Sequence, residues 1–315
     1  MNIPTPGEIR HVRERPVSSA RYDEDWIASA WGKEGNSALL RKGPITPRPR
    51  VARAMELAAI RPGHRVLDIA CGRGEVPAIA CQRGAHAVGL DYAEASIQFA
   101  QRVKRVHGQS NGPGQLDLVQ ADACRLPFPE DTFDRVTMLD IVEHLLPAQL
   151  AAMFDEVRRV LKPDAFAVIH TLPNRWVYDV TYPLLHKLFR KFPRNPRSES
   201  ERAIHVNEQD LPSLHRVLRA AGLSHQIWLE QYTAAQARWS TSGDQFDDTR
   251  DRIYPMLSGA AGRLLEVMSH TPLKLLLCND IYGVLWKGSA RPVDVRSRLV
   301  LVERLACLLS AKQEP

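Results

Sequence analysis

Residues 65–92 constrain the fold of this chain more than any other stretch of its sequence. A mostly apolar run, residues 66–70, leads into Gly72 and Gly74, and a second apolar run, residues 87–90, follows and ends at an acidic residue. The distance between the two runs is typical of parallel strands joined by a crossover helix. Glycines allow a sharp turn and a close approach of the backbone to a ligand. The stretch therefore predicts a strand, a glycine turn, a helix and a second strand in an α/β protein that binds a nucleotide-like ligand.

Two kinds of nucleotide site match this pattern. A glycine turn after a strand, with an acidic residue roughly twenty residues later, also describes the dinucleotide site that holds NAD. If Gly72 opens the NAD motif, the third glycine of that motif falls at position 77, where this chain has Pro77. An acidic residue, Asp68, also stands ahead of the glycines, at the end of the first predicted strand. Pro77 and Asp68 therefore favour a nucleoside site of another kind than the NAD site.

The segments DIACGRG and GLDY resemble motif I and the second acidic loop of the class I S-adenosylmethionine (SAM)-dependent methyltransferases. The resemblance implies that Asp68, Gly72 and Gly74 border the methionine half of SAM, and that Asp91 accepts hydrogen bonds from both ribose hydroxyls. A carboxylate suits that role because its two oxygens match a vicinal diol. Ala70 stands where the family usually has glycine. A tight turn in some other α/β protein is the alternative.

A third acidic residue, Asp122, follows a short predicted strand at residues 116–119. The family resemblance implies that Asp122 hydrogen-bonds the adenine amino group and that Ala123 offers its backbone N–H. A plain turn residue or helix cap is the alternative for Asp122. The full set of residues that we expect to contact the cofactor comprises Asp68, Ala70, Gly72, Gly74, Asp91, Tyr92, Asp122, Ala123 and Leu139.

A cluster of Asp140, Glu143 and His144 follows the fourth predicted strand, residues 133–139. The carboxyl ends of strands in an open parallel sheet are where ligands bind. His144 has an ordinary pKa near working pH, and we expect it to take a proton from a hydroxyl acceptor. The cluster also resembles the E-x-x-E-H metal site of ubiquinone-pathway and small-RNA O-methyltransferases, for which His205 is a further ligand candidate. We expect no metal, and a purely structural role is the other alternative.

Several classes of protein are disfavoured by the rest of the sequence. The 315 residues contain no apolar run long enough to span a membrane and no apolar secretory signal at the start. The five cysteines form no C-x-x-C pair, which favours a reduced, cytoplasmic protein and disfavours a zinc site. The segment after the fourth strand lacks the N/D-P-P-Y/F pattern that holds a flipped base, and no Pro-Cys pair occurs. A small-molecule acceptor is therefore expected, and DNA and RNA are not.

The predicted methyltransferase domain spans residues 51–288 and has additions at both ends. Residues 1–50 are expected to form an N-terminal arm packed on the core or a lid, to which Tyr22, Trp26 and Trp31 would contribute. We also expect cap insertions near residues 176–205 and 232–276 and a C-terminal helical tail at residues 289–315. Apolar residues repeat at helical spacing in the tail, which predicts a helix docked on its own core or on a second subunit in a homodimer.

Residues 176–197 interleave aromatic and basic side chains. That composition fits peripheral contact with a membrane surface, a nucleic acid or an anionic small molecule, and the alternative is a pocket wall with a solvated basic edge. The net charge of +6 permits an anionic partner without requiring one.

The sequence thus predicts a doubly wound, mostly parallel, seven-stranded Rossmann-like sheet with an N-terminal lid and helical insertions. The predicted activity is SAM-dependent methyl transfer to a hydroxyl of a small molecule, or in second place to an amine. A SAM-binding regulatory or assembly protein without catalytic activity is the alternative from another class. An enzyme of NAD or nucleotide sugars is a further rival.

Overall fold

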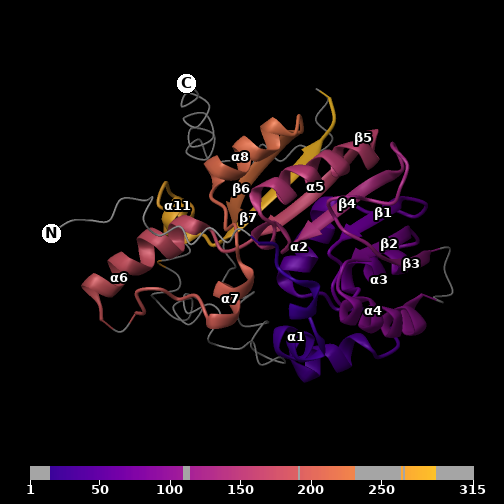
Figure 1. The fold of residues 1–315 in the computed structure, drawn as a ribbon, viewed down its shortest axis with the longest axis horizontal. Helices are drawn as coiled ribbons and strands as arrows, with labels where there is room; N and C mark the ends of the chain where they lie inside the picture. The colour runs from indigo at the N-terminus through magenta and orange to yellow at the C-terminus, as the bar shows by residue number, and fades with distance from the viewer. Residues whose placement is uncertain (1–14, 109–113, 191, 231–263, 265–266, 289–315) are drawn as a thin grey trace.

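The computed structural model describes residues 15–108, 114–190, 192–230, 264 and 267–288 (Figure 1). Within them, a seven-stranded sheet has the order β3-β2-β1-β4-β5-β7-β6. Neighbours from β3 to β5 pair in parallel, and β7 is antiparallel to both β5 and β6. The strands are β1 Arg65–Ile69, β2 His86–Asp91, β3 Gln115–Gln120, β4 Phe133–Leu139, β5 Leu161–Thr171, β6 Ser224–Glu230 and β7 Asp280–Trp286. The predicted doubly wound, mostly parallel sheet is confirmed.

Helices cover both faces of this sheet, because alternate side chains along each strand point to opposite faces. Val66 of β1 belongs to the apolar cluster that also holds residues of α2, α3 and α4. Leu67 and Ile69 belong to the opposite cluster, with residues of α5 and α8. These helices are α2 Pro49–Ala58, α3 Glu75–Gln82, α4 Glu94–His107, α5 Pro147–Val160 and α8 Leu211–Ala220.

The strand order reverses direction at β1, which lies between β2 and β4. In an open α/β sheet, ligands bind outside the carboxyl ends of the strands at such a point. Asp91 closes β2, Leu139 closes β4, and the glycine turn follows β1. The topology therefore brings the residues expected to bind the cofactor to one edge of the sheet.

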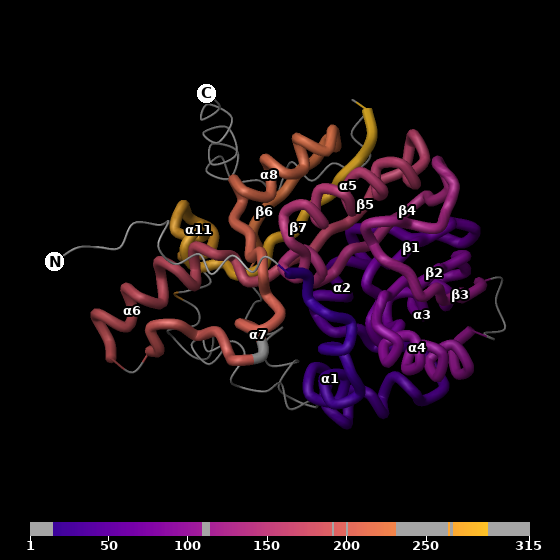
Figure 2. The backbone as a smooth tube through the Cα atoms, in the orientation of Figure 1, coloured from indigo at the N-terminus to yellow at the C-terminus, as the bar shows by residue number. Residues whose placement is uncertain are grey.

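The N-terminal segment lies beside this edge. It contains η1 Ser19–Arg21 and α1 Glu24–Leu39, whose first turn is capped by the Asp23 side chain. Figure 2 shows α1 next to α4, with which it makes contact. Whether the segment opens and closes as a lid stays a prediction.

The apolar run at residues 166–171 predicts a fifth strand that begins at Phe166, but strand β5 begins five residues earlier, at Leu161. Leu161 pairs with Phe133, and the register then shifts before Arg135 pairs with Phe166. The extra residues are tied to β4 because Lys162 Nζ donates to Asp134 Oδ1 at 2.7 Å. Lys162 and Pro163, which follow the end of a helix, therefore also belong to the start of a strand.

The predicted insertion after β5 forms η3 Val177–Thr181, α6 Tyr182–Leu188 and α7 Glu199–Ile204. Residues 232–263 of the second insertion lie outside the described residues, and α11 Lys274–Leu277 follows it before β7. The tail at residues 289–315, with its expected dimer contact, lies outside them as well. Across the described residues, we find no helix with the length and apolar character that a membrane span requires.

Candidate active site

The turn after β1 is built on three left-handed residues. The backbone angle φ is 59° at Ala70, 51° at Gly72 and 82° at Gly74. A Cβ on Gly74 would lie 3.0 Å from the Cβ of Ala100, so this glycine lets the turn pack closely on α4. Ala70 adopts the same conformation with a side chain, at a cost of about 1–2 kcal/mol. The turn therefore has the glycine-type geometry that the resemblance implied, including the position occupied by alanine.

Asp91 holds the glycine turn against the end of β2. Its Oδ2 accepts a hydrogen bond from the backbone N–H of Gly72 at 2.9 Å, and its Oδ1 accepts one from Ala93 at 2.9 Å. Only 7% of Asp91 is exposed, and burial raises its pKa. Each carboxylate oxygen keeps a further lone pair, so Asp91 can still accept from a vicinal diol. The arrangement fits the ribose role that we predicted.

Asp68 belongs to β1, and its side chain contacts β4. Its Oδ1 accepts a hydrogen bond from Thr137 Oγ1 at 2.6 Å, and the residue is 3% exposed. Burial raises the pKa of Asp68 to about 7, although the Thr137 hydrogen bond opposes the shift. Asp68 and Asp91 thus lie on adjacent strands on either side of the glycine turn, as a sulfonium nucleoside would require.

The remaining residues predicted to bind SAM are less buried. Asp122 is exposed and accepts from the backbone N–H of Cys124 at 2.8 Å, which is the turn geometry named as its alternative. Ala123 is buried next to it, and Leu139 is half-buried at the end of β4. Tyr92 is 38% exposed, and its hydroxyl donates to the carbonyl of Val17 at 3.3 Å. Cofactor contact by this group stays a prediction.

Three aromatic residues of the N-terminal segment reach the same edge. The ring centroids of Tyr22 and Trp26 are 4.8 Å apart, and those of Trp26 and Trp31 are 4.9 Å apart. Trp31 lies so close to the glycine turn that a Cβ on Gly72 would be 3.2 Å from its ring. The guanidinium of Arg73 lies 5.5 Å from the centroid of the same ring. The N-terminal aromatic residues therefore cover the predicted cofactor loop.

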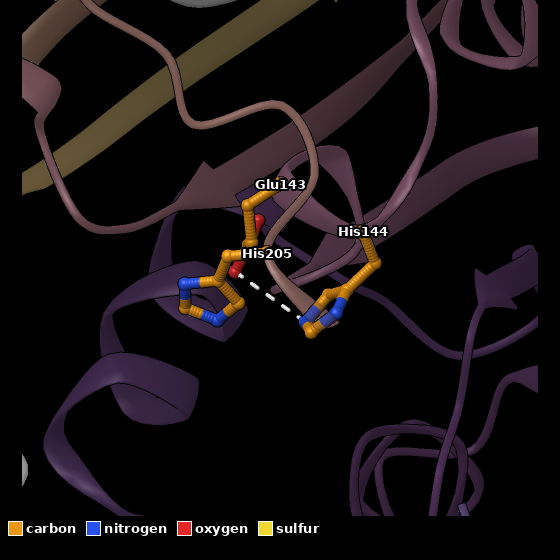
Figure 3. A group of neighbouring side chains, drawn as sticks. All are labelled: Glu143, His144 and His205. Carbon is orange, nitrogen blue, oxygen red and sulfur yellow. Dashed lines mark ion pairs between the residues drawn. The ribbon is translucent and has the colours of Figure 1, made fainter. Parts of the chain in front are cut away.

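Glu143, His144 and His205 form a cluster beyond β4 (Figure 3). Glu143 and His144 belong to η2 Val142–His144, and His205 follows α7. One possible ligand atom from each of the three lies within 4.8 Å of the others, so they could hold a metal ion. Imidazole and carboxylate donors suit Mn²⁺ or Zn²⁺ better than Mg²⁺. The structure therefore brings His205 to the place that the resemblance to a metal site implied.

Burial controls the protonation of this cluster. Burial is the largest cause of the low pKa of His144, about 3, and the charge of His205 contributes to the same shift. Burial also raises the pKa of Glu143 to about 7, helped by the charge of Asp140, while Thr171 Oγ1 donates to Glu143 Oε2 at 2.6 Å. His144 is therefore neutral over the physiological range, and its Nε2 contacts Glu143 Oε1 at 3.9 Å as a neutral group.

His144 also contacts the N-terminal segment. The hydroxyl of Tyr22 and Nδ1 of His144 share a hydrogen bond of 2.9 Å, and their ring centroids are 5.8 Å apart. Burial raises the pKa of Tyr22 far above its usual range, so its phenol keeps its proton. A protonated hydroxyl and a neutral imidazole therefore meet at this edge of the sheet.

A charge network behind the cluster, in which His170 and Asp280 are buried, was not predicted from the sequence. His170 of β5 bonds to Asp140 Oδ1 through Nδ1 at 2.5 Å and to Asp280 Oδ1 through Nε2 at 2.8 Å. Arg50 Nη1 lies 3.2 Å from Asp140 Oδ2. Asp140 has a φ of 58°, a strained value for a residue other than glycine. A histidine in an apolar strand that ends at the ligand edge was the one local signal for this network.

The network favours a charged His170. Burial disfavours the imidazolium, but the Asp140 and Asp280 carboxylates raise the pKa of His170 to about 9. Burial likewise opposes ionisation of Asp140, yet Arg50 and His170 hold its pKa well below the usual range. A fixed carboxylate, Asp140, therefore stands at the end of β4 next to the Glu143 and His144 pair.

We expect the free energy of unfolding to fall as pH rises through about 9. His170 binds its proton more tightly in the folded protein, with a pKa of about 9, than in the unfolded chain. Its stabilising contribution is therefore complete below a pH of about 6.5 and is lost as pH rises through the folded value, up to roughly 3 kcal/mol. Urea unfolding of His170→Gln should show most of this pH dependence removed. His215→Gln, at a half-buried histidine of α8, is the matched control and should keep it. An equal pH dependence in both variants would contradict the assignment.

Comparison with known proteins agrees with this geometry. Residues 67–169 match the family model described as a methyltransferase domain. An uncharacterized methyltransferase of Synechocystis sp. is 35% identical over 162 residues, which cover 51% of this chain and 68% of that protein. A ubiquinone biosynthesis O-methyltransferase of Hahella chejuensis is 34% identical over 173 residues, which cover 54% of this chain and 68% of that protein.

Among solved structures, the [4+2]-cyclase SpnF superposes with a TM-score of 0.55 at 16% identity. The match covers 89% of this chain and 99% of that one, and it shows the shared fold. The domain match, the identity to relatives over two thirds of their length and the sheet order together establish the family. This chain belongs to the class I SAM-dependent methyltransferases, enzymes for which SAM is the methyl donor.

Proposed function

We propose that this protein transfers the methyl group of SAM to a hydroxyl oxygen of a small-molecule acceptor. The observation that carries the proposal is the 2.9 Å hydrogen bond between the Tyr22 hydroxyl and His144 Nδ1. The contact places a hydroxyl group beside a neutral, buried imidazole at the carboxyl edge of the sheet. An acceptor hydroxyl that takes the place of the phenol would be next to a base. The names of matching relatives include both O- and C-methyltransferases. The assignment of oxygen as the acceptor atom therefore depends on the contact between Tyr22 and His144.

The proposed cofactor site lies between Asp68, the glycine turn and Asp91. Asp91 would accept hydrogen bonds from the ribose hydroxyls through the lone pairs that Gly72 and Ala93 leave free. Asp68 would face the methionine half of SAM. One of its carboxylate oxygens already accepts a hydrogen bond from Thr137. Bound SAM supplies an activated methyl carbon, and its sulfur keeps the bonding electron pair when the methyl group leaves.

The proton step falls to His144. As the acceptor oxygen forms its bond to the methyl carbon, the hydroxyl proton passes to the imidazole, so positive charge moves to His144. Glu143 Oε1, 3.9 Å from His144 Nε2, stabilises that charge when the carboxyl group is ionised. The rest of the rate enhancement comes from aligning the hydroxyl and excluding water, because the methyl group is already activated.

A direct test uses SAM labelled with carbon-13 in its methyl group. The protein is incubated with labelled SAM and a small-molecule filtrate of cell extract, and new methyl signals are assigned by NMR. The proposal predicts a methyl group bonded to oxygen, formed by the wild type and not by His144→Gln. A methyl group bonded to carbon or nitrogen would contradict the assigned acceptor atom. SAM binding by calorimetry without any transfer would instead favour a regulatory or assembly protein.

A further inference from the structure

One helix of this protein exposes apolar side chains along its outer face. Helices η3 and α6 are consecutive, and Val180, Leu184 and Leu188 recur every four residues along them. These three side chains lie on one face of a helix. They are 46%, 52% and 63% exposed, and the next residue, Phe189, is 54% exposed. The helix is nevertheless anchored, because Val177 and other residues of its opposite face are buried.

The exposure is concentrated and not scattered. Among the described residues, eight large apolar side chains are exposed, and four of them form this stripe. Three others, Leu264, Val267 and Leu273, belong to the segment before α11. Helix α11 itself packs on η3, and Thr181 Oγ1 donates to the carbonyl of Leu276, a residue of α11, at 2.5 Å. Figures 1 and 2 show α6 extending away from the sheet, with α11 near its base. Contiguous exposed apolar surface of this kind marks an interaction site.

Basic side chains surround the stripe. Lys187 lies on α6 next to Leu188, and Arg190 and Arg194 follow within one loop; all three are exposed. Within the part of the chain that the structure describes, none of the three forms an ion pair. The acidic residue of the same helix, Asp179, is already paired with Arg197 at 2.9 Å. The local charge that remains is therefore positive.

We propose that this surface binds the face of an anionic lipid bilayer. We call it the α6 surface, and it consists of Val180, Leu184, Lys187, Leu188, Phe189, Arg190 and Arg194. An amphipathic helix lies in the membrane interface with its apolar face among the acyl chains and its basic residues at the headgroups. Basic residues near the surface add attraction to anionic lipids, which a neutral bilayer does not supply. The α6 surface combines both features on an element that extends from the domain, and its binding needs neither SAM nor an acceptor.

The test is cosedimentation of the full chain with vesicles of phosphatidylcholine, with and without phosphatidylglycerol. We expect binding to the anionic vesicles to be at least about tenfold tighter than to the neutral ones, and to weaken as salt is added. The double variants L184E/L188E and R190E/R194E should each lose about tenfold or more of this affinity. The matched control is R61E/R65E, which removes the same charge from exposed arginines at the amino edge of the sheet. It should bind like the wild type.

Three results would overturn the proposal. Absence of vesicle binding would do so directly. If R190E/R194E and R61E/R65E lost equal amounts of affinity for the anionic vesicles, the net charge of the protein would attract the vesicles without a specific surface. A wild-type dimer that becomes monomeric in L184E/L188E, without vesicle binding, would assign the stripe to a second copy of the chain. If circular dichroism shows that L184E/L188E does not fold, the vesicle binding of the two arginine variants tests the proposal without it.

Discussion

Asp91→Ala is expected to weaken SAM binding by about 100-fold or more. In the proposed complex, Asp91 accepts hydrogen bonds from both ribose hydroxyls, and a hydrogen bond to a charged group contributes about 1.5–3 kcal/mol. Two such bonds therefore correspond to a loss of at least about two powers of ten in affinity. Asp91 also holds the N–H groups of Gly72 and Ala93, so the variant should loosen the glycine turn as well. Isothermal titration with SAM and with its demethylated product measures the loss.

Two further variants separate the cofactor role from damage to the fold. Asp91→Asn keeps one acceptor oxygen, and we expect affinity between those of the wild type and Asp91→Ala. Asp117→Ala removes an acid from the adjacent strand β3, where its partner is Lys104 at 3.0 Å, and it should leave SAM affinity unchanged. Thermal unfolding of each variant reports stability separately. Wild-type SAM affinity in a destabilised Asp91→Ala protein would remove Asp91 from the cofactor site.

Local patterns predicted the elements that carry the cofactor loop. The glycine turn follows β1 as expected, and β4 Phe133–Leu139 has the bounds that its apolar run indicated. These features depend on neighbours in sequence, which periodicity and turn residues report directly. The start of β5 was wrong because Leu161 is added to the sheet by its pairing with Phe133, a contact between segments that a local pattern does not contain.

The charge network could not be predicted for the same physical reason. His170 and Asp280 are separated by 110 positions and meet because β5 and β7 pair antiparallel, with Thr171 opposite Ile281. The Tyr22 and His144 contact joins residues 122 positions apart. The residues next to each of these side chains in sequence do not indicate which partner it will have. The register of the sheet and the path of the N-terminal segment are what give them partners.

His144→Gln is expected to lower kcat by about 10²–10⁴ while leaving SAM affinity nearly unchanged. The loss reflects the missing base, because glutamine keeps the polar contact with Tyr22 without taking a proton. His215→Gln is the matched control on a surface helix and should retain wild-type kcat. Since burial holds the pKa of His144 at about 3, its own protonation should not shape the pH profile near neutrality.

The pH profile should instead follow Glu143, whose pKa is raised to about 7. Its carboxylate forms as pH rises through that value and stabilises the imidazolium, so kcat should rise with pH there, and Glu143→Gln should remove the rise. A rise near 6.5 that survives in Glu143→Gln would mean that His144 titrates itself and is less buried when the acceptor is bound. Activity that EDTA abolishes and Mn²⁺ restores would show that turnover needs a metal ion, for which Glu143, His144 and His205 are the ligand candidates, because a base needs no ion to accept a proton. The two roles therefore differ in which addition rescues the enzyme, a higher pH for the base and a divalent cation for the ligand set.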